Sequence, residues 1–193
     1  MFRQSTDKHV AVFVAEGLEE IEGLTVVDLL FRAGIPCDTV SIVEDHGVTS
    51  SHQVRITCDR SIYDEGFSFD DYDMLVLPGG MPGTLNLGAC EPLCGALKRF
   101  AAEGRQVAAI CAAPTVLAKL GILEGRRATC FPGMEDALVE HGAKLTAGAV
   151  VVDGNVTTSR GMGTAIDFGL RIVGHYLGEE PARALAAKIV YRA

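Results

Sequence analysis

The chain has 193 residues, of which 48% are hydrophobic and 22% are charged, and its net charge is -8. This length suits one globular core, so we expect a single domain over residues 1–193. The negative charge argues against a specific nucleic-acid partner, because such binding needs clustered Lys and Arg. No apolar run approaches the roughly 20 residues that cross a bilayer, which predicts a soluble, cytoplasmic protein without a membrane partner.

Short apolar runs alternate with helical segments in the first half of the chain. The first predicted strand, residues 9–14, is apolar and largely β-branched, as expected for a strand buried on both faces. A helix is predicted over residues 18–33, because Gly34 follows it as a stop signal. A second strand is expected at 39–43, and the pattern of residues 48–62 is typical of a small antiparallel hairpin.

The second half continues the alternation and defines the fold class. Thr164 and Asp167 have the spacing of a capping box at the start of a helix. Strands alternating with helices favour an α/β fold, a three-layer αβα sandwich with a mostly parallel sheet. The predicted strands are residues 73–78, 106–110, 126–130 and a hairpin turning at 153–155, and the predicted helices are residues 91–103, 164–177 and 181–190.

The cysteines and histidines show no pattern of disulfides or of a metal site. A chain of this size and apolar content needs no disulfide staples, so we expect free thiols. The five histidines are not paired at metal-ligand spacing. We therefore expect neither a metal nor another cofactor. The six cysteines are Cys37, Cys58, Cys90, Cys94, Cys111 and Cys130.

Cys111 stands where a reactive residue is expected in such a fold. It directly follows the strand predicted at 106–110 and precedes a helix with Pro114 in its first turn. Ligands of open α/β sheets bind beyond the carboxyl ends of the strands. The N-terminus of a helix lowers the pKa of a nearby thiol, which predicts a nucleophilic thiolate at Cys111. The alternative is an ordinary buried thiol.

Three other segments follow predicted strands. Four carboxylates fall within residues 16–22, and most of them are explained by the preference for acidic residues in a first helical turn. Glu22 is the one we expect over the strand ends, where it could shuttle a proton. Gly79 and Gly80 could offer backbone N–H groups to an oxyanion or simply form a tight turn. Residues 159–163 form either an anion-binding turn or, as we favour, a connector.

These segments together resemble a known family. In order along the chain, AEGLEEIEGLTVVDLLFRAG, DMLVLPGG, AAICAAPTVLAKLGIL and TSRGMGTAIDFGLRIV are similar to the ThiJ/PfpI superfamily, in the branch of the Parkinsonism-associated protein deglycase and bacterial YajL. The resemblance spans nearly the whole chain. It implies a flavodoxin-like sandwich and a homodimer.

The resemblance also implies roles for particular residues. Cys111 matches a nucleophilic, oxidation-prone cysteine, and Glu22 matches its protonated partner. Several members carry a histidine near the cysteine where this chain has Phe131, so a Cys-His-Glu triad is in doubt, and His52 is a candidate to substitute across the dimer interface. The other matched positions are Gly79, Gly80 and Ala112 as backbone donors, Glu19 as a site residue, and Arg32 and Thr115 near the pocket or dimer edge.

Two functions remain open from the sequence. The first is an enzyme that converts small reactive aldehydes without glutathione, of the glyoxalase or deglycase type, through a Cys111 hemithioacetal with Glu22 as proton shuttle. The second is an oxidative-stress sensor or redox-regulated chaperone that acts through sulfinic acid formation at Cys111. A glutamine amidotransferase is disfavoured because the chain lacks a downstream His-x-Glu pair. A PfpI-type peptidase is disfavoured because Ala112 stands where those enzymes have histidine.

Overall fold

The fold is built on one sheet of seven strands within residues 2–191, the part of the chain that the computed structural model describes. The strands are β1 (Val10–Val14), β2 (Cys37–Ser41), β5 (Arg60–Ser61), β6 (Met74–Leu77), β7 (Gln106–Ile110), β10 (Val150–Asp153) and β11 (Val156–Ser159). They run in the order β10-β11-β7-β6-β1-β2-β5. All neighbouring pairs are parallel except β10 and β11, so the carboxyl ends of β1, β6, β7 and β11 meet at one edge.

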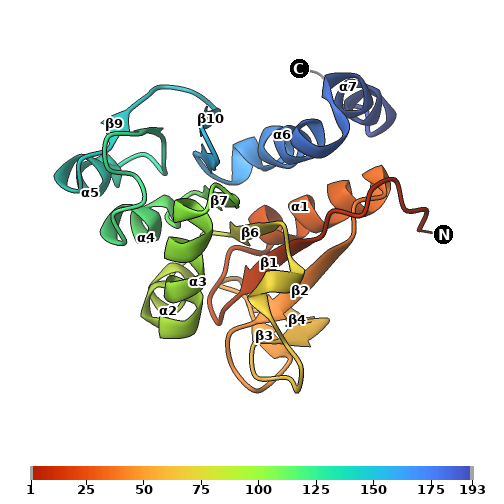
Figure 1. The fold of residues 1–193 in the computed structure, drawn as a ribbon, viewed down its shortest axis with the longest axis horizontal. Helices are drawn as coiled ribbons and strands as arrows, with labels where there is room; N and C mark the ends of the chain where they lie inside the picture. Colours follow the sequence, from red (N-terminus) through yellow and green to blue (C-terminus); the bar gives the residue numbers. More distant parts are fainter. Residues whose placement is uncertain (1, 192–193) are drawn as a thin grey trace.

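Helices cover both faces of this sheet (Figure 1). One layer consists of α2 (Gly83–Ala89), α3 (Glu91–Ala102), α4 (Pro114–Lys119) and α5 (Glu135–Glu140). The other consists of α1 (Glu20–Ala33), α6 (Ala165–Leu177) and α7 (Glu179–Lys188). The predicted α/β sandwich with a mostly parallel sheet is therefore confirmed.

Side-chain alternation along the central strands builds a separate core on each face. In β1, Ala11 and Phe13 belong to the core beneath α2–α5, whereas Val10 and Val12 belong to the core beneath α1, α6 and α7. All four are completely buried. Successive side chains of a strand point to opposite faces, so an apolar run without polar gaps is what a doubly covered strand requires.

Several local signals in the sequence act as predicted. Gly34 ends α1 in a left-handed conformation, φ 77°, and its N–H donates to the carbonyl of Leu30. The hairpin of β10 and β11 turns at Gly154 and Asn155. The antiparallel hairpin predicted within 48–62 is formed by β3 (Gly47–Thr49) and β4 (Arg55–Thr57).

Other expectations are wrong. The segment 126–130 adds no strand to the main sheet, because β11 already occupies the free side of β7. Only β8 (Arg127–Ala128) is extended there, and it pairs with β9 (Lys144–Leu145) in a separate two-stranded sheet. Thr164 is the N-cap residue of α6 by position, but its hydroxyl makes no capping hydrogen bond to that helix. It instead accepts from the Gly161 N–H, just before the short 3₁₀ helix η2 (Met162–Thr164). Helices α2 and α5 lie in segments for which no helix was predicted.

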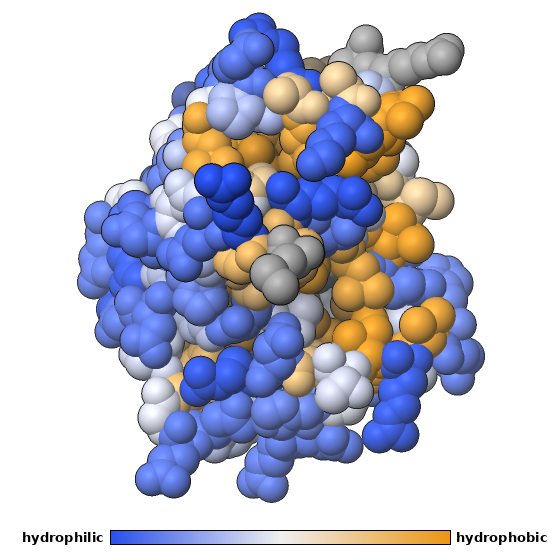
Figure 2. Space-filling view, turned by 90° about the vertical axis from the view of Figure 1, so that its right-hand side faces the viewer, coloured by the Kyte–Doolittle hydropathy of each residue, from blue (hydrophilic) through white to orange (hydrophobic). Residues whose placement is uncertain are grey.

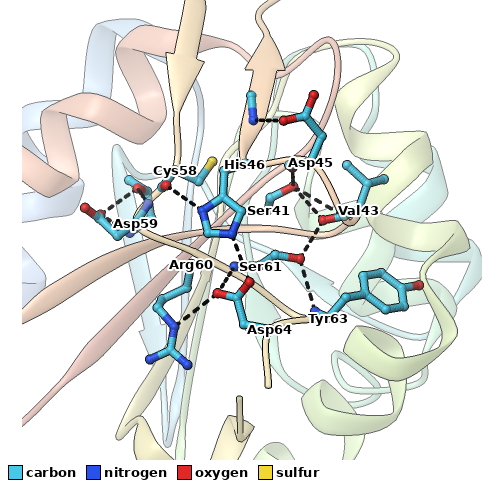
Figure 3. A network of polar contacts seen from close by, with 12 residues as sticks. Ser41, Val43, Asp45, His46, Cys58, Asp59, Arg60, Ser61, Tyr63 and Asp64 are labelled. Atoms are coloured by element: carbon cyan, nitrogen blue, oxygen red, sulfur yellow. Dashed lines mark hydrogen bonds and ion pairs between the residues drawn. The ribbon is translucent and has the colours of Figure 1, made fainter. Parts of the chain in front are cut away.

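A polar network fastens the β3–β4 hairpin to β5, the outermost strand on one side of the sheet (Figure 3). His46 lies between the Cys58 carbonyl, 3.2 Å from Nδ1, and the Asp64 carboxylate, 2.9 Å from Nε2. Asp64 also accepts hydrogen bonds from the Ser61 amide and the Arg60 guanidinium. The short strand β5 is thereby held next to β2 by side chains as well as by its two backbone pairs.

Among the residues that the structure describes, no helix is long and apolar enough to span a membrane.

Candidate active site

Cys111 occupies a strained turn between β7 and α4. Its φ is 65°, a left-handed conformation that residues with a β-carbon rarely adopt. The turn is held from both sides: the Cys111 N–H donates to the Ser159 carbonyl at 3.0 Å, and the Cys111 carbonyl accepts from the Phe131 N–H at 2.7 Å. Pro114 opens α4 just after it, as the sequence predicted. The geometry is that of a nucleophile elbow, in which a sharp turn presents the side chain at the end of the sheet.

Glu22 reaches the same edge of the sheet from the first turn of α1. Glu19 is the N-cap of this helix, and its carboxylate accepts a hydrogen bond from the Glu22 N–H at 2.8 Å. This cap begins the helix so that the Glu22 side chain points inward, where it is 1% exposed. Its Oε2 accepts from the Gly79 N–H at 2.9 Å. Within residues 2–191, its other oxygen, Oε1, is buried without a hydrogen-bond partner of normal geometry.

Gly79 lies between Cys111 and Glu22. A β-carbon at this position would lie 2.6 Å from Cys111 Cβ, 2.6 Å from Glu22 Oε2 and 3.1 Å from the Ala112 nitrogen. Only glycine lets these groups approach so closely. Gly80 has a φ of 90° and packs against the backbone of residues 17–19. The structure therefore brings together Cys111, Glu22, Gly79, Gly80 and Ala112, five of the residues singled out in the sequence.

The environment shifts the proton affinities of both reactive groups. Burial raises the pKa of Glu22 to about 7, against smaller lowering effects from Cys111 and the Gly79 N–H. Burial, followed by the charge of the Glu22 carboxylate, raises the pKa of Cys111 to about 12. The N–H groups of Ala112 and Gly80 lower it only partly. The expectation that the helix N-terminus leaves Cys111 with a lowered pKa is wrong, because burial beside a carboxylate outweighs the helix.

The remaining predicted residues have different surroundings. Thr115 is buried, and its hydroxyl donates to the Ala112 carbonyl at 2.8 Å, so it stabilises the turn beside Cys111. Arg32 lies ten residues after Glu22 along α1, about 15 Å away at the rise of a helix. It pairs with Asp28 at 2.6 Å. Arg32 is thus remote from Cys111 within its own chain.

His52 lies beside the first turn of α1. Its Nδ1 is 3.0 Å from Glu20 Oε2 and 3.9 Å from Glu19 Oε1. One ligand atom from each of these three residues lies within 4.8 Å of the other two, so they are the described residues that could hold a cation. The histidine already pairs with Glu20, and exposed acidic groups often gather without a metal. The expectation that no metal is bound stays a prediction.

Sequence reasoning underrated the segment after β11. Ser159 supplies the carbonyl that holds the Cys111 N–H. A β-carbon on Gly161 would lie 3.8 Å from Glu22 Oε1, so the backbone there covers the buried carboxyl. The Met162 backbone also lowers the pKa of Glu22, as a lesser effect than burial. The signal that could have found this segment is its place directly after a strand neighbouring β7.

Comparison with known proteins decides the family. The family model described as DJ-1/PfpI matches residues 8–175. The chain belongs to the DJ-1/PfpI family. This confirms the resemblance found in the sequence.

Individual relatives agree with this assignment. Protein dj-1beta of Drosophila melanogaster is 37% identical over 93% of this chain and 95% of its own length. Its crystal structure superposes with a TM-score of 0.89, at 35% identity over 97% of this chain and 100% of that one. A Caenorhabditis elegans relative named glutathione-independent glyoxalase DJR-1.2 is 34% identical over 88% of this chain and 89% of its own. The chain covers only 42% of the Arabidopsis thaliana Protein DJ-1 homolog B, at 35% identity over 97% of its own length.

Proposed function

We propose that this DJ-1/PfpI member converts small reactive aldehydes such as methylglyoxal and glyoxal to hydroxy acids without glutathione. The observation that carries the proposal is the strained Cys111 turn packed, across Gly79, against the buried Glu22 carboxyl. A nucleophile held next to an acid–base group with a shifted pKa is an arrangement that suits covalent catalysis. The name of the C. elegans relative supports the substrate class.

The proposed reaction begins with addition of Cys111 to the aldehyde. The sulfur forms a bond to the carbonyl carbon while the thiol proton passes to Glu22 and from there to the aldehyde oxygen, which gives a hemithioacetal. The N–H groups of Gly80 and Ala112 would donate to the developing oxyanion. Both groups lower the pKa of Cys111, so they already favour negative charge on its sulfur, next to the carbon to which the oxyanion would be bonded.

The hemithioacetal then isomerises. Glu22 removes the proton from the former aldehyde carbon and returns a proton to the neighbouring carbon, while the hydroxyl proton of the hemithioacetal passes to the neighbouring carbonyl oxygen. The former aldehyde carbon thereby becomes the carbonyl of a thioester, and its neighbour carries the hydroxyl group. Water hydrolyses the thioester, releasing lactate from methylglyoxal or glycolate from glyoxal and restoring the thiol. No external oxidant or reductant enters this sequence. A carboxyl with a pKa of about 7 suits it, since such a group accepts and donates protons near neutral pH.

The protein is also proposed to act as a homodimer of single-domain chains. Hydrophobic side chains gather on the face of the molecule seen in Figure 2. On α1, Ile21 is 47% exposed, Leu24 37% and Phe31 53%. Ile21, Leu24 and Arg32 also line a cavity of 460 Å³. A second copy would cover these apolar groups, and His52 of each chain is proposed to lie at the resulting interface.

The free thiols support a proposal for the compartment. All six cysteines lie within the described residues, and all six are free. Free cysteines persist where glutathione and thioredoxin keep thiols reduced, so we place the protein in the cytoplasm.

Glutathione-free turnover of methylglyoxal tests the proposed function. We expect lactate formation by the wild type and by a Cys94→Ser control, whose thiol lies on α3 and bonds the carbonyl of Gly88. Cys111→Ser and Glu22→Gln should lose turnover by about 10²-fold or more. Undiminished aldehyde consumption by Cys111→Ser would contradict the proposal.

A redox sensor or redox-regulated chaperone is the second candidate, and the free Glu22 Oε1 favours it. A protonated carboxyl at this place could donate to a sulfinate on Cys111. Oxidation consumes two peroxide molecules, adds two oxygens to the sulfur and releases two waters. Mass spectrometry of peroxide-treated Glu22→Gln decides between the two functions, since the amide can hydrogen-bond a sulfinate but cannot shuttle a proton. Retained oxidation with lost turnover favours the enzyme.

A further inference from the structure

The backbone from Ser159 to Gly161, between β11 and α6, lies against both members of the reactive pair, and two linked side-chain hydroxyls hold this backbone. Ser159 ends β11 and is completely buried. Its carbonyl accepts the Cys111 N–H, and its hydroxyl lies 2.8 Å from the hydroxyl of Thr164. Thr164 in turn accepts a hydrogen bond from the Gly161 N–H at 3.1 Å. Gly161 is the residue whose backbone covers Glu22 Oε1.

Counting protons shows the direction in which hydrogen bonds are donated along these hydroxyls. The Ser159 hydroxyl donates to the Ala149 carbonyl at 2.7 Å, and a hydroxyl has only one proton to give. The proton between the two hydroxyls must then come from Thr164, since otherwise two lone pairs would face each other at 2.8 Å. The Gly161 carbonyl, 2.9 Å from the Thr164 hydroxyl, competes for the same proton, but it keeps its bond from the Thr164 N–H at 2.8 Å when that proton goes to Ser159. Donation along the hydroxyl chain therefore runs from the Gly161 amide through Thr164 and Ser159 to the Ala149 carbonyl.

The hydroxyl chain supports both parts of the site. Cys111 needs an anchor for its left-handed backbone, and the buried Ser159 provides it. Glu22 needs a fixed backbone over its free oxygen, and Gly161 and Met162 provide it. A turn made largely of glycine would otherwise be free to move, because residues 161 and 163 are both glycine.

We propose that Ser159 and Thr164 are positioning residues of the Cys111–Glu22 pair, whose hydroxyl chain locks the Gly161–Met162 backbone over Glu22 while holding the Cys111 turn. The inference rests on the proposed function only in taking this pair as the reacting centre. Neither hydroxyl touches the substrate. Both act by fixing backbone groups that contact the two reactive side chains.

Titration of Glu22 in Thr164 variants tests the inference without any aldehyde. The carboxyl carbon of ¹³C-labelled Glu22 is followed by NMR against pH and assigned by its absence in Glu22→Gln. Thr164→Val keeps the shape of the side chain but removes the hydroxyl. The Met162 backbone contact, which favours the carboxylate, should then loosen, so we expect the Glu22 midpoint to rise by roughly 0.5 to 1 pH unit.

Two further variants separate positioning from general destabilisation. Thr164→Ser keeps the hydroxyl and should return the midpoint to the wild-type value. Thr146→Val is the matched control, because it removes a threonine hydroxyl that bonds the Lys144 carbonyl at 3.2 Å, beside β9. It should leave Glu22 unchanged. An unshifted midpoint in Thr164→Val, or equal shifts in Thr164→Val and Thr164→Ser, would overturn the inference.

A measurement on the wild type needs no variant to fold. The Gly161 amide should be protected from hydrogen exchange, because it donates into the hydroxyl chain. Exchange at the rate of an open loop would overturn the inference. Absent methylglyoxal turnover would refute the proposed enzyme but leave both readouts intact, so the two failures can be told apart.

Discussion

Replacing Gly79 by alanine adds one methyl group at the tightest point of the site. Its carbon would lie 2.6 Å from both Cys111 Cβ and Glu22 Oε2, well inside van der Waals contact. The backbone at Gly79 does not have the positive φ of Gly80, so the cost comes from contact. Neither neighbour can yield easily, since Glu22 is buried and the Cys111 turn is bonded at both ends.

The magnitude follows from two effects. Overfilling a packed site costs about 1 to 3 kcal/mol. Displacement of Glu22 Oε2 also breaks its hydrogen bond from the Gly79 N–H, which is worth about 1.5 kcal/mol for a charged acceptor and less when Glu22 is protonated. We expect Gly79→Ala to lower the free energy of unfolding by about 3 kcal/mol in total. For a chain of this size, that corresponds to a fall in Tm of about 6 to 12 °C.

Thermal unfolding followed by circular dichroism measures the effect, and Gly95→Ala provides the matched control. Gly95 is exposed in the interior of α3, and a β-carbon there meets no atom of the described chain within 4 Å. Alanine favours a helix over glycine by about 0.5 to 1 kcal/mol, so Gly95→Ala should raise Tm slightly. Equal stability of Gly79→Ala and the wild type would refute the close packing of Cys111, Gly79 and Glu22.

Three other expectations concern pH and assembly. Glu22 has a pKa of about 7 in the folded protein, above its unfolded value, so the folded state binds more protons between pH 4.5 and 7. The free energy of unfolding should therefore fall by on the order of 3 kcal/mol as pH rises through this window. When it is measured by denaturant unfolding at several pH values, its dependence on pH should be weaker in Glu22→Gln. Hydrogen bonding to Asp64 raises the pKa of His46, so this pair stabilises the fold fully below about pH 6.5. The stabilisation is lost as pH rises past the pKa of His46 in the folded protein. His46→Asn should therefore lower Tm more at pH 5.5 than at pH 8.5, and equal losses would contradict the ion pair. Light scattering should give a dimer for the wild type and a monomer for Leu24→Glu, whereas a wild-type monomer would refute the proposed interface.

Part of the site could be predicted from local sequence rules. Cys111, Gly79 and Glu22 each come shortly after an apolar run, and the ends of parallel strands share one edge of the sheet. Their meeting at one place therefore follows from strand order alone. Ser159 and Thr164 also lie at or just after the end of a strand, but serine and threonine at such a place are equally typical of a connector, so their position alone does not single them out.

The errors in the fold have the same origin. The segment 126–130 has a strand-like composition, but whether it joins a sheet depends on which neighbour is free, and β11 pairs with β7 instead. Thr164 has the spacing of a helix cap, yet its hydroxyl finds partners in Gly161 and Ser159. Both outcomes are decided by competition between distant segments.

The sequence by itself determined the α/β class, the end of the first helix at Gly34, and the place of Cys111 at the end of a buried strand. These features depend on periodicity and on neighbours in the chain. Tertiary structure alone decided the proton affinities. The helix N-terminus predicted a lowered pKa for Cys111, whereas burial next to Glu22 raises it to about 12. Desolvation and the charge of a residue 89 positions away depend on packing in space, which no local pattern records.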